Sequence, residues 1–420
     1  MSERFSRRHP DFSRLWLGQS ISLVGTQVTF VALPLLAITT LHASTLEVGL
    51  LAGAETLPFL LIGLPAGVWV DRWRRRPVLV AADAGRGLLL ASIPLAYAMG
   101  VLHMVQLYVV AFGTGILTVF FDVAYQSYVP GLVAGEALID ANARLEVSYS
   151  AAQTLGPGIG GVLVQAVGAA TAILIDTISY ALSAVVLLTI RADEPKPERH
   201  EADAALGMFA SVRQGLRYVL RHRLLVRIAA CSALYNLFSA MSMAVFLLYA
   251  VRDLRVSPAT IGLLFSAGGA ALVGGTLLMA RMGSRLRTGA ALSVGALIQG
   301  LAFLLVPAAP LSHPVPFFFA AIVLESLFSP AYNITQISLR QTVTPPRLHG
   351  RMTATMRFLV WGALPLGSVL GGVLASQVGR HTTLWVSAAG GALSALPVLL
   401  GPLRGLKSMP DPEPEASLVG

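Results

Sequence analysis

The residues best suited to chemistry are carboxylic acids that interrupt long apolar stretches. Glu325 lies about ten residues inside the stretch 314–341, and Glu55 lies at a similar depth in the stretch 46–70. At ~1.5 Å per helical residue, both carboxyls would lie ~15 Å from the end of their helix, near the middle of a bilayer. An ionisable group at that depth is costly, so each is a functional candidate. The chemistry open to it is uptake and release of a proton, because an apolar cavity disfavours the charged form.

Other charged residues also interrupt apolar stretches. Asp122 is our third candidate for proton coupling, although its position late in its stretch also suits a pair with Arg144 near the membrane surface. Asp83 and Arg86 are three residues apart, so we expect them to pair on one helical face. The alternative for Glu325 and Glu55 is a hydrogen bond across a helix interface without any proton transfer. For Asp176 we favour structural packing.

The composition indicates what kind of protein holds these acids. Of 420 residues, 55% are hydrophobic and 12% are charged, whereas soluble domains have about 25% charged residues. An ordinary soluble fold is therefore excluded. The formal net charge of +9 comes from basic residues in short breaks between apolar stretches, which indicates membrane topology and not nucleic-acid binding.

Enzyme signatures are missing from the sequence. Neither lysine follows the glycine that a phosphate-binding GxxxxGK[ST] loop requires, so an ATPase motor is not expected. The eight histidines form no HExxH pattern, and the single cysteine, Cys231, cannot form an intrachain disulfide. We therefore expect no enzymatic activity, no metal and no cofactor.

The apolar stretches are long enough to cross a bilayer, which takes about 20 residues per helix. They predict an all-α membrane protein with twelve transmembrane helices. The first stretch has full spanning length, so we expect an uncleaved helix and no signal peptide. The span at 141–166 is the weakest because Arg144 and Glu146 open it. The predicted spans are 13–39, 46–70, 77–99, 104–129, 141–166, 169–190, 224–251, 257–280, 288–308, 314–341, 350–377 and 381–402.

Basic residues concentrate on one side of the predicted spans. If the N-terminus is cytoplasmic, twenty-six of the thirty lysines and arginines fall in cytoplasmic segments, as the positive-inside rule requires. The exceptions are Arg252, Arg255 and Arg380 on the other side and Arg86 within a span. Both termini are therefore expected in the cytoplasm.

The chain divides into two similar halves. We expect a six-helix bundle at 1–190, a cytoplasmic linker with an amphipathic helix at 191–223, a second six-helix bundle at 224–402 and a disordered cytoplasmic tail at 403–420. The sequence LGPGIGGVL at 155–163 matches LGSVLGGVL at 366–374, six spans later. An even number of spans per copy gives both copies one orientation, so the halves are parallel repeats.

The loop between the second and third spans has a recognisable pattern. Residues 67–76, GVWVDRWRRR, resemble the cytoplasmic-loop signature of the major facilitator superfamily, with Arg74 where that family often has glycine. The resemblance implies a cluster that latches the cytoplasmic ends of the helices in one state and releases them in another. Gly67 would allow two helices to approach closely. The implied gate residues are Gly67, Asp71, Arg72, Arg75, Arg76, Arg144 and Arg351.

The fifth span has a second pattern. Residues 156–161, GPGIGG, resemble the fifth-helix motif of drug:proton antiporters of that superfamily, with Ala152 where a further glycine would fall. The motif residues are Gly156, Pro157, Gly160 and Gly161. Ordinary small-residue packing is the alternative, because the eleventh span has nearly the same pattern. The stretches 121–130, 141–143 and 176–180 are most similar to macrolide-efflux proteins and enterobactin exporters.

The resemblance implies a major facilitator fold with two pseudo-symmetric six-helix bundles and alternating access to a central cavity. The tenth helix lines that cavity in the superfamily, which makes Glu325 the first choice for proton coupling. The implied function is export of small amphiphilic molecules, a drug or a natural product, by proton antiport across a bacterial inner membrane, by a monomer that binds no nucleic acid. Two alternatives stay open: an importer or facilitator of a metabolite, and a receptor or scaffold without transport. Expected cavity residues are Gln27, Tyr125, Tyr235, Asn236, Phe238, Tyr332 and Asn333.

Overall fold

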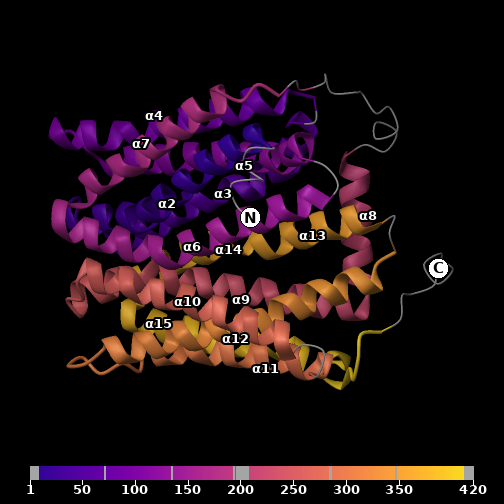
Figure 1. Cartoon of the computed structure of the whole chain (residues 1–420). Coiled ribbons are helices and arrows are strands. Elements are labelled where there is room, and N and C mark those ends of the chain that lie inside the picture. Colours follow the sequence, from indigo (N-terminus) through magenta and orange to yellow (C-terminus); the bar gives the residue numbers. More distant parts are fainter. Residues whose placement is uncertain are drawn as a thin grey trace. The chain divides into compact units, whose positions relative to one another are not determined.

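The computed structural model describes residues 9–70, 72–133, 136–192, 194, 208–282, 286–345 and 348–410. Within these residues every regular element is a helix (Figure 1). The chain divides into two compact units. Unit 1 comprises residues 1–199 and 255–266, and unit 2 comprises residues 200–254 and 267–420.

Unit 1 is built from long apolar helices that pack side by side. Helix α2 packs against α6 and α7, α4 packs against α5 and α7, and α3 packs against α5. The first turns of α10 (Pro258–Met282) also belong to this unit. Its helices are α2 (Pro10–Thr39), α3 (Thr45–Val70), α4 (Arg75–Ala98), α5 (Met104–Leu132), α6 (Glu136–Val167) and α7 (Ala169–Leu188).

Unit 2 has the same kind of core. Helix α9 packs against α14 and α15, and α11 packs against α12 and α15. The elements of unit 2, besides the rest of α10, are α8 (Met208–Arg221), α9 (Arg223–Leu248), the π-helix η2 (Tyr249–Asp253), α11 (Thr288–Ala302), the 3-10 helix η4 (Phe303–Leu305), α12 (Val315–Val343), α13 (His349–Trp361), α14 (Ala363–Val378), α15 (Arg380–Leu393), α16 (Leu396–Leu399) and the 3-10 helix η6 (Pro402–Gly405).

The observed helices agree closely with the predicted spans. Among the described residues, eleven helical segments are long and apolar enough to cross a membrane. Helix α6 is the remaining predicted span; it has 32 residues and begins earlier than expected, at Glu136. The predicted span 350–377 consists of two helices, α13 and α14, that meet at Gly362. The last span is likewise divided into α15 and α16.

The matching sequence patterns in the two halves make equivalent helix contacts. In unit 1, a Cβ on Gly160 of α6 would lie 3.0 Å from the Cα of Val28 on α2. In unit 2, a Cβ on Gly371 of α14 would lie 3.0 Å from the Cα of Met241 on α9. Because glycine has no side chain, the two backbones can touch in each pair.

Helix α8 differs from the spans in direction and composition. Figure 1 shows it running across the ends of the other unit 2 helices. Gly215 and Val219 are buried against other helices of unit 2. Arg213, Arg217 and Arg221 are exposed. Its described part is therefore the amphipathic helix that the sequence predicts, while most of the linker before it, like the end of the tail, lies outside the described residues.

Candidate functional site

Glu325 lies in the middle of α12 and faces α9. Its Oε1 accepts a 2.6 Å hydrogen bond from the Tyr235 hydroxyl, and its Oε2 accepts one of 3.1 Å from Ser326. The Tyr235 ring in turn packs against Phe303, with 5.7 Å between ring centroids. The half-buried carboxyl therefore contacts two hydroxyl groups, and one of them belongs to a ring that packs on Phe303.

Acidic residues are scarce in unit 2. Within its described residues the acids are Asp253 and Glu325. Asp253 forms a two-pronged ion pair with Arg380, with 2.6 Å between Oδ2 and Nε and 2.5 Å between Oδ1 and Nη2. No described cation pairs with Glu325 in this way, so its charge is not compensated by a salt bridge.

The two acids of unit 1 that we ranked with Glu325 have different surroundings. Glu55 has an exposed side chain on α3. Its backbone carbonyl lies against α5, where a Cβ on Gly115 would be 2.7 Å from the oxygen. Asp122 is half-buried on α5 and lies close enough to Arg86 to interact electrostatically.

Asp83 and Arg86 form the buried ion pair that their spacing predicts. Asp83 Oδ1 accepts a hydrogen bond from Arg86 Nη2, and both side chains are buried. The central carbon of the guanidinium group lies 4.4 Å from the centroids of two aromatic rings, Phe121 and Tyr180. Contact with these rings offsets part of the cost of burying this cation. The pair thus joins α4 to α5 and α7 within unit 1.

Asp176 of α7 is bonded to hydroxyl groups. Its carboxylate accepts hydrogen bonds of 2.5 Å from Thr29 on α2 and 3.0 Å from Ser179 on its own helix. Gly25 allows this approach, because a Cβ there would lie 2.9 Å from the Cα of Asp176. These contacts suit a role in packing α2 against α7.

The basic loop after α3 contacts the end of α7. The backbone amides of Arg75 and Arg76, at the start of α4, donate to the carboxylate of Glu194 at 2.5 and 3.2 Å. The Arg76 side chain donates to the carbonyl of Leu187 at 3.1 Å. An acid at a helix N-terminus is a known stabilising arrangement. The sequence did not predict this role for Glu194, because more than a hundred residues separate it from Arg75.

The other proposed gate residues have separate surroundings within their own units. Asp71 lies outside the described residues, and Arg72 is exposed. A Cβ built on Gly67 would have no described atom of another helix within 4 Å, so the close helix approach expected there is not seen. Arg144 on α6 lies 5.8 Å from the Trp16 ring. Arg351 on α13 donates to Gln214 of α8 within unit 2.

The glycines of α6 hold it between two neighbours in unit 1. On one side, a Cβ on Gly156 would lie 2.9 Å from the Gln27 Cγ on α2. On the other, the amide of Gly158 donates a 2.8 Å hydrogen bond to Ser266 of α10. Pro157 is buried between these contacts. The motif therefore serves close packing on both sides of the helix.

The seven expected cavity residues have different surroundings. Tyr235 contacts Glu325, and Tyr125 of α5 stacks on Phe121 with 5.8 Å between ring centroids. Gln27 is half-buried against Gly156, and Asn333 is exposed on α12, where it donates to Ser329 at 2.9 Å.

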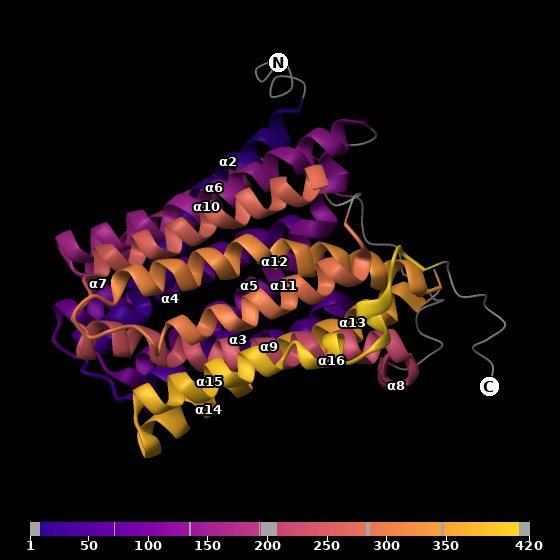
Figure 2. The same cartoon turned by 90° about the horizontal axis from the view of Figure 1, so that it is seen from below.

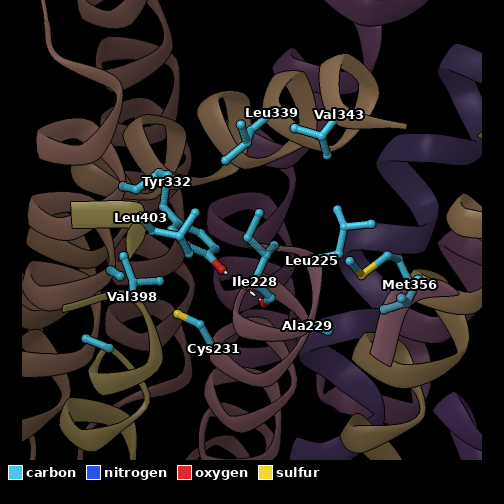
Figure 3. Close-up of a cluster of buried hydrophobic side chains, with 14 of the residues drawn as sticks. Leu225, Ile228, Ala229, Cys231, Tyr332, Leu339, Val343, Met356, Val398 and Leu403 are labelled. Atoms are coloured by element: carbon cyan, nitrogen blue, oxygen red, sulfur yellow. Dashed lines mark hydrogen bonds between the residues drawn. The ribbon is translucent and has the colours of Figure 1, made fainter. Parts of the chain in front are cut away.

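The remaining three make contacts between helices of unit 2. Tyr332 lies in the hydrophobic core (Figure 3). Its hydroxyl lies 2.8 Å from that of Ser232. Asn236 donates a 2.9 Å hydrogen bond to the carbonyl of Val360 on α13. The Phe238 ring fills the space beside Gly390 on α15. These contacts suit packing and not substrate binding.

Comparison with known proteins agrees with this architecture. The chain matches the family described as "Transmembrane secretion effector" over residues 5–417. It is 30% identical to the multidrug efflux pump Tap of Mycolicibacterium fortuitum over 393 residues, covering 90% of each protein. It is 27% identical to the enterobactin exporter EntS of Escherichia coli O1:K1 / APEC, covering 94% of this chain and 92% of EntS.

A solved structure shows the same fold. The crystal structure of a bacterial homologue of the iron transporter ferroportin matches with a TM-score of 0.77 at 16% identity, covering 93% of this chain and 98% of that one. This likeness confirms the predicted major facilitator fold. Since the family match also extends over nearly the whole chain, this multi-pass helical protein belongs to the transmembrane secretion effector family of the major facilitator superfamily and is a membrane transporter, not an enzyme.

Proposed function

We propose that this transporter exports small amphiphilic molecules across a bacterial cell membrane in exchange for protons. The names of two relatives, a multidrug efflux pump and an enterobactin exporter, support export of small molecules. The positive-inside distribution of arginine supports a cytoplasmic position for both termini. We expect the two halves to alternate access to a path between them, as inward proton flow supplies the free energy.

The observation on which proton coupling depends is the environment of Glu325. This carboxyl lies in the middle of a spanning helix, accepts a 2.6 Å hydrogen bond from Tyr235 and is not in an ion pair with any described residue. Even partial burial of a carboxylate without a cation is costly, and this one is half-buried. The group therefore gains from a proton when its surroundings are dry and can release it when water enters.

Coupling follows if the proton and the substrate compete. In the state open to the cytoplasm, release of the proton from Glu325 would leave a charged, hydrogen-bonded carboxylate that stabilises bound substrate. In the state open to the outside, protonation would weaken that interaction and release the substrate. The ligand could then move outward only as protons move inward.

The substitution Glu325→Gln tests this role because the amide keeps the shape of the side chain but cannot titrate. We expect it to abolish proton-driven transport in proteoliposomes while exchange of labelled for unlabelled substrate continues. The substrate would be chosen from a drug-susceptibility panel in a pump-deficient bacterial host. Asp253→Asn is the matched control, since it removes the other described carboxyl of unit 2. An unchanged pH dependence in Glu325→Gln would refute the assignment.

Direction of transport needs a separate measurement. Inside-out membrane vesicles expose the cytoplasmic face to the medium, so an exporter accumulates its substrate when the vesicles are energised. Accumulation that collapses on addition of a protonophore supports proton-driven export. If inside-out vesicles do not accumulate the substrate and right-side-out vesicles take it up, the importer is favoured. If neither kind of vesicle moves the substrate, a receptor is favoured.

A further inference from the structure

A cavity of about 610 Å³ lies at one end of unit 2, between the start of α11, the residues after α16 and the 3-10 helix η6. Figure 2 shows α16 and the following chain at the same end of the unit as α8 and α13. One candidate span begins at Thr288 and another ends at Leu399. The cavity therefore lies at the ends of two candidate spans, where lipid headgroups are expected.

The charged lining of this cavity is basic. Arg287 and Arg404 both line it, and its nine lining residues include no aspartate or glutamate. The two described acids of unit 2 are Glu325, bonded to Tyr235, and Asp253, paired with Arg380. Two guanidinium groups on one cavity repel each other unless an anion lies between them. The described structure contains no acid that fills this role.

Packing fixes the backbone at the two arginines, whose side chains are exposed. Gly289 allows η6 to lie against the start of α11, because a Cβ there would be 2.7 Å from the carbonyl carbon of Arg404. Its amide donates a 2.9 Å hydrogen bond to the carbonyl of Leu406. The cavity is thus framed by backbone contacts, and it does not depend on the rotamers of surface side chains alone.

Two further features favour an anionic ligand. Helix α11 begins at Thr288 without a side-chain cap. The Gly289 amide is bonded to the Leu406 carbonyl, but the helix dipole still attracts negative charge to this end. Ser293 lines the cavity, is 9% exposed, and its hydroxyl has no hydrogen-bond partner among the described residues. A buried hydroxyl without a partner is unusual. It is available to donate to an oxygen of a ligand.

We propose that this cavity binds a phosphate group, with Arg287 and Arg404 forming bonds to its oxygens and Ser293 donating a further hydrogen bond. Arginine is suited to this because its planar group can bond two phosphate oxygens at once. The exposed side chain of Leu400 lies on the rim of the cavity, 77% exposed at the end of the last span. A phosphate attached to an apolar tail, as in an anionic phospholipid, fits both features. Inorganic phosphate shares the headgroup chemistry.

The test uses purified full-length protein stripped of lipid in a neutral detergent. Thermal unfolding and native mass spectrometry would be followed on addition of phosphatidylglycerol, phosphatidylcholine or inorganic phosphate. We expect phosphatidylglycerol to raise the unfolding midpoint and to remain bound. The double variant R287Q/R404Q should bind it at least about tenfold more weakly, since it loses two charge-assisted hydrogen bonds.

Two further variants make the result specific. R213Q/R217Q removes the same charge from exposed positions on α8 and should respond to phosphatidylglycerol like the unmodified protein. S293A should bind it several-fold more weakly without loss of folding, so it tests the site even if R287Q/R404Q is unstable. Inorganic phosphate could also raise the unfolding midpoint of the unmodified protein and not that of R287Q/R404Q. That result would support the site and would identify its ligand as a soluble phosphate in place of a lipid. Equal responses of the unmodified protein, R287Q/R404Q and S293A would overturn the proposal.

Discussion

Gly161 of α6 and Gly262 of α10 lie back to back within unit 1, and a Cβ on either residue would be 2.9 Å from the Cα of the other. The carbonyl oxygens of Pro258 and Pro157 are also among the atoms that such a Cβ would meet. Because backbone atoms form these contacts, a side chain cannot be accommodated by a change of rotamer. The helix pair therefore depends on glycine at both positions.

The first prediction follows from this contact. Gly161→Ala should lower the stability of the folded protein by ~1–3 kcal/mol, because overpacking forces the helices apart. The measurement is the unfolding midpoint in detergent. Gly131→Ala is the matched control, since it also adds one methyl group to a helical glycine but meets nothing within 4 Å. Equal midpoints for the two variants would contradict the packing argument.

The second prediction concerns the buried ion pair of unit 1. Arg86→Gln leaves the buried Asp83 carboxylate without its cation, which should cost ~3–5 kcal/mol. It also removes the cation that contacts the Phe121 and Tyr180 rings. The unfolding midpoint should fall far more than in Arg213→Gln, which removes an exposed arginine from α8. If both variants unfold at the same temperature, the pair contributes nothing to stability.

The third prediction separates a gate from a simple helix cap. Glu194→Gln should destabilise the protein by ~1 kcal/mol, because it weakens the cap at the start of α4. If this contact belongs to a cytoplasmic gate, transport should also slow several-fold. Glu47→Gln, which weakens the contact with Ser44 at the start of α3, should lose similar stability with unchanged transport. Unaltered transport in both variants would leave Glu194 with a structural role only.

The fourth prediction compares two tyrosine hydroxyls of unit 2. Tyr235→Phe removes the donor to Glu325. Loss of a hydrogen bond to a charged group costs ~1.5–3 kcal/mol, and a loss of this size would slow proton-driven transport about tenfold or more. Tyr332→Phe removes the hydroxyl that contacts Ser232 in the core, so stability should fall while the rate per folded molecule stays the same. Initial rates in proteoliposomes distinguish the two. Equal rates would contradict the special role of Tyr235.

The positions of most helices could be predicted from the sequence because each apolar stretch must be long enough to cross a bilayer. Helix α2, for example, ends at Thr39, the predicted limit. The break at Gly362 and the π-helix at Tyr249–Asp253 were not predicted. Gly362 lies within an apolar stretch, so hydropathy contains no signal for the break. Arg252 and Asp253 mark the end of the other stretch but do not distinguish a π-helix from an α-helix.

Side-chain orientation was harder to predict than helix position. Spanning helices are apolar on every face, so periodicity does not distinguish a core residue from a cavity residue. We expected Tyr332 to line a cavity, and it lies in the core, whereas Tyr235, expected beside it in the same cavity, contacts Glu325. Asp83 and Arg86 could be paired because a spacing of three residues defines one helical face. The contact of Glu194 with the start of α4 could not be predicted, because only the tertiary structure brings these residues together.

Proton movement driven by substrate is the most direct test of coupling at Glu325. Proteoliposomes with a trapped pH-sensitive dye and no pH gradient would receive the transported compound identified by the susceptibility panel. The account predicts that protons leave the lumen as substrate enters, and that Glu325→Gln moves substrate without any pH change. Equal proton movement by the unmodified protein and by Glu325→Gln, at equal substrate flux, would contradict it.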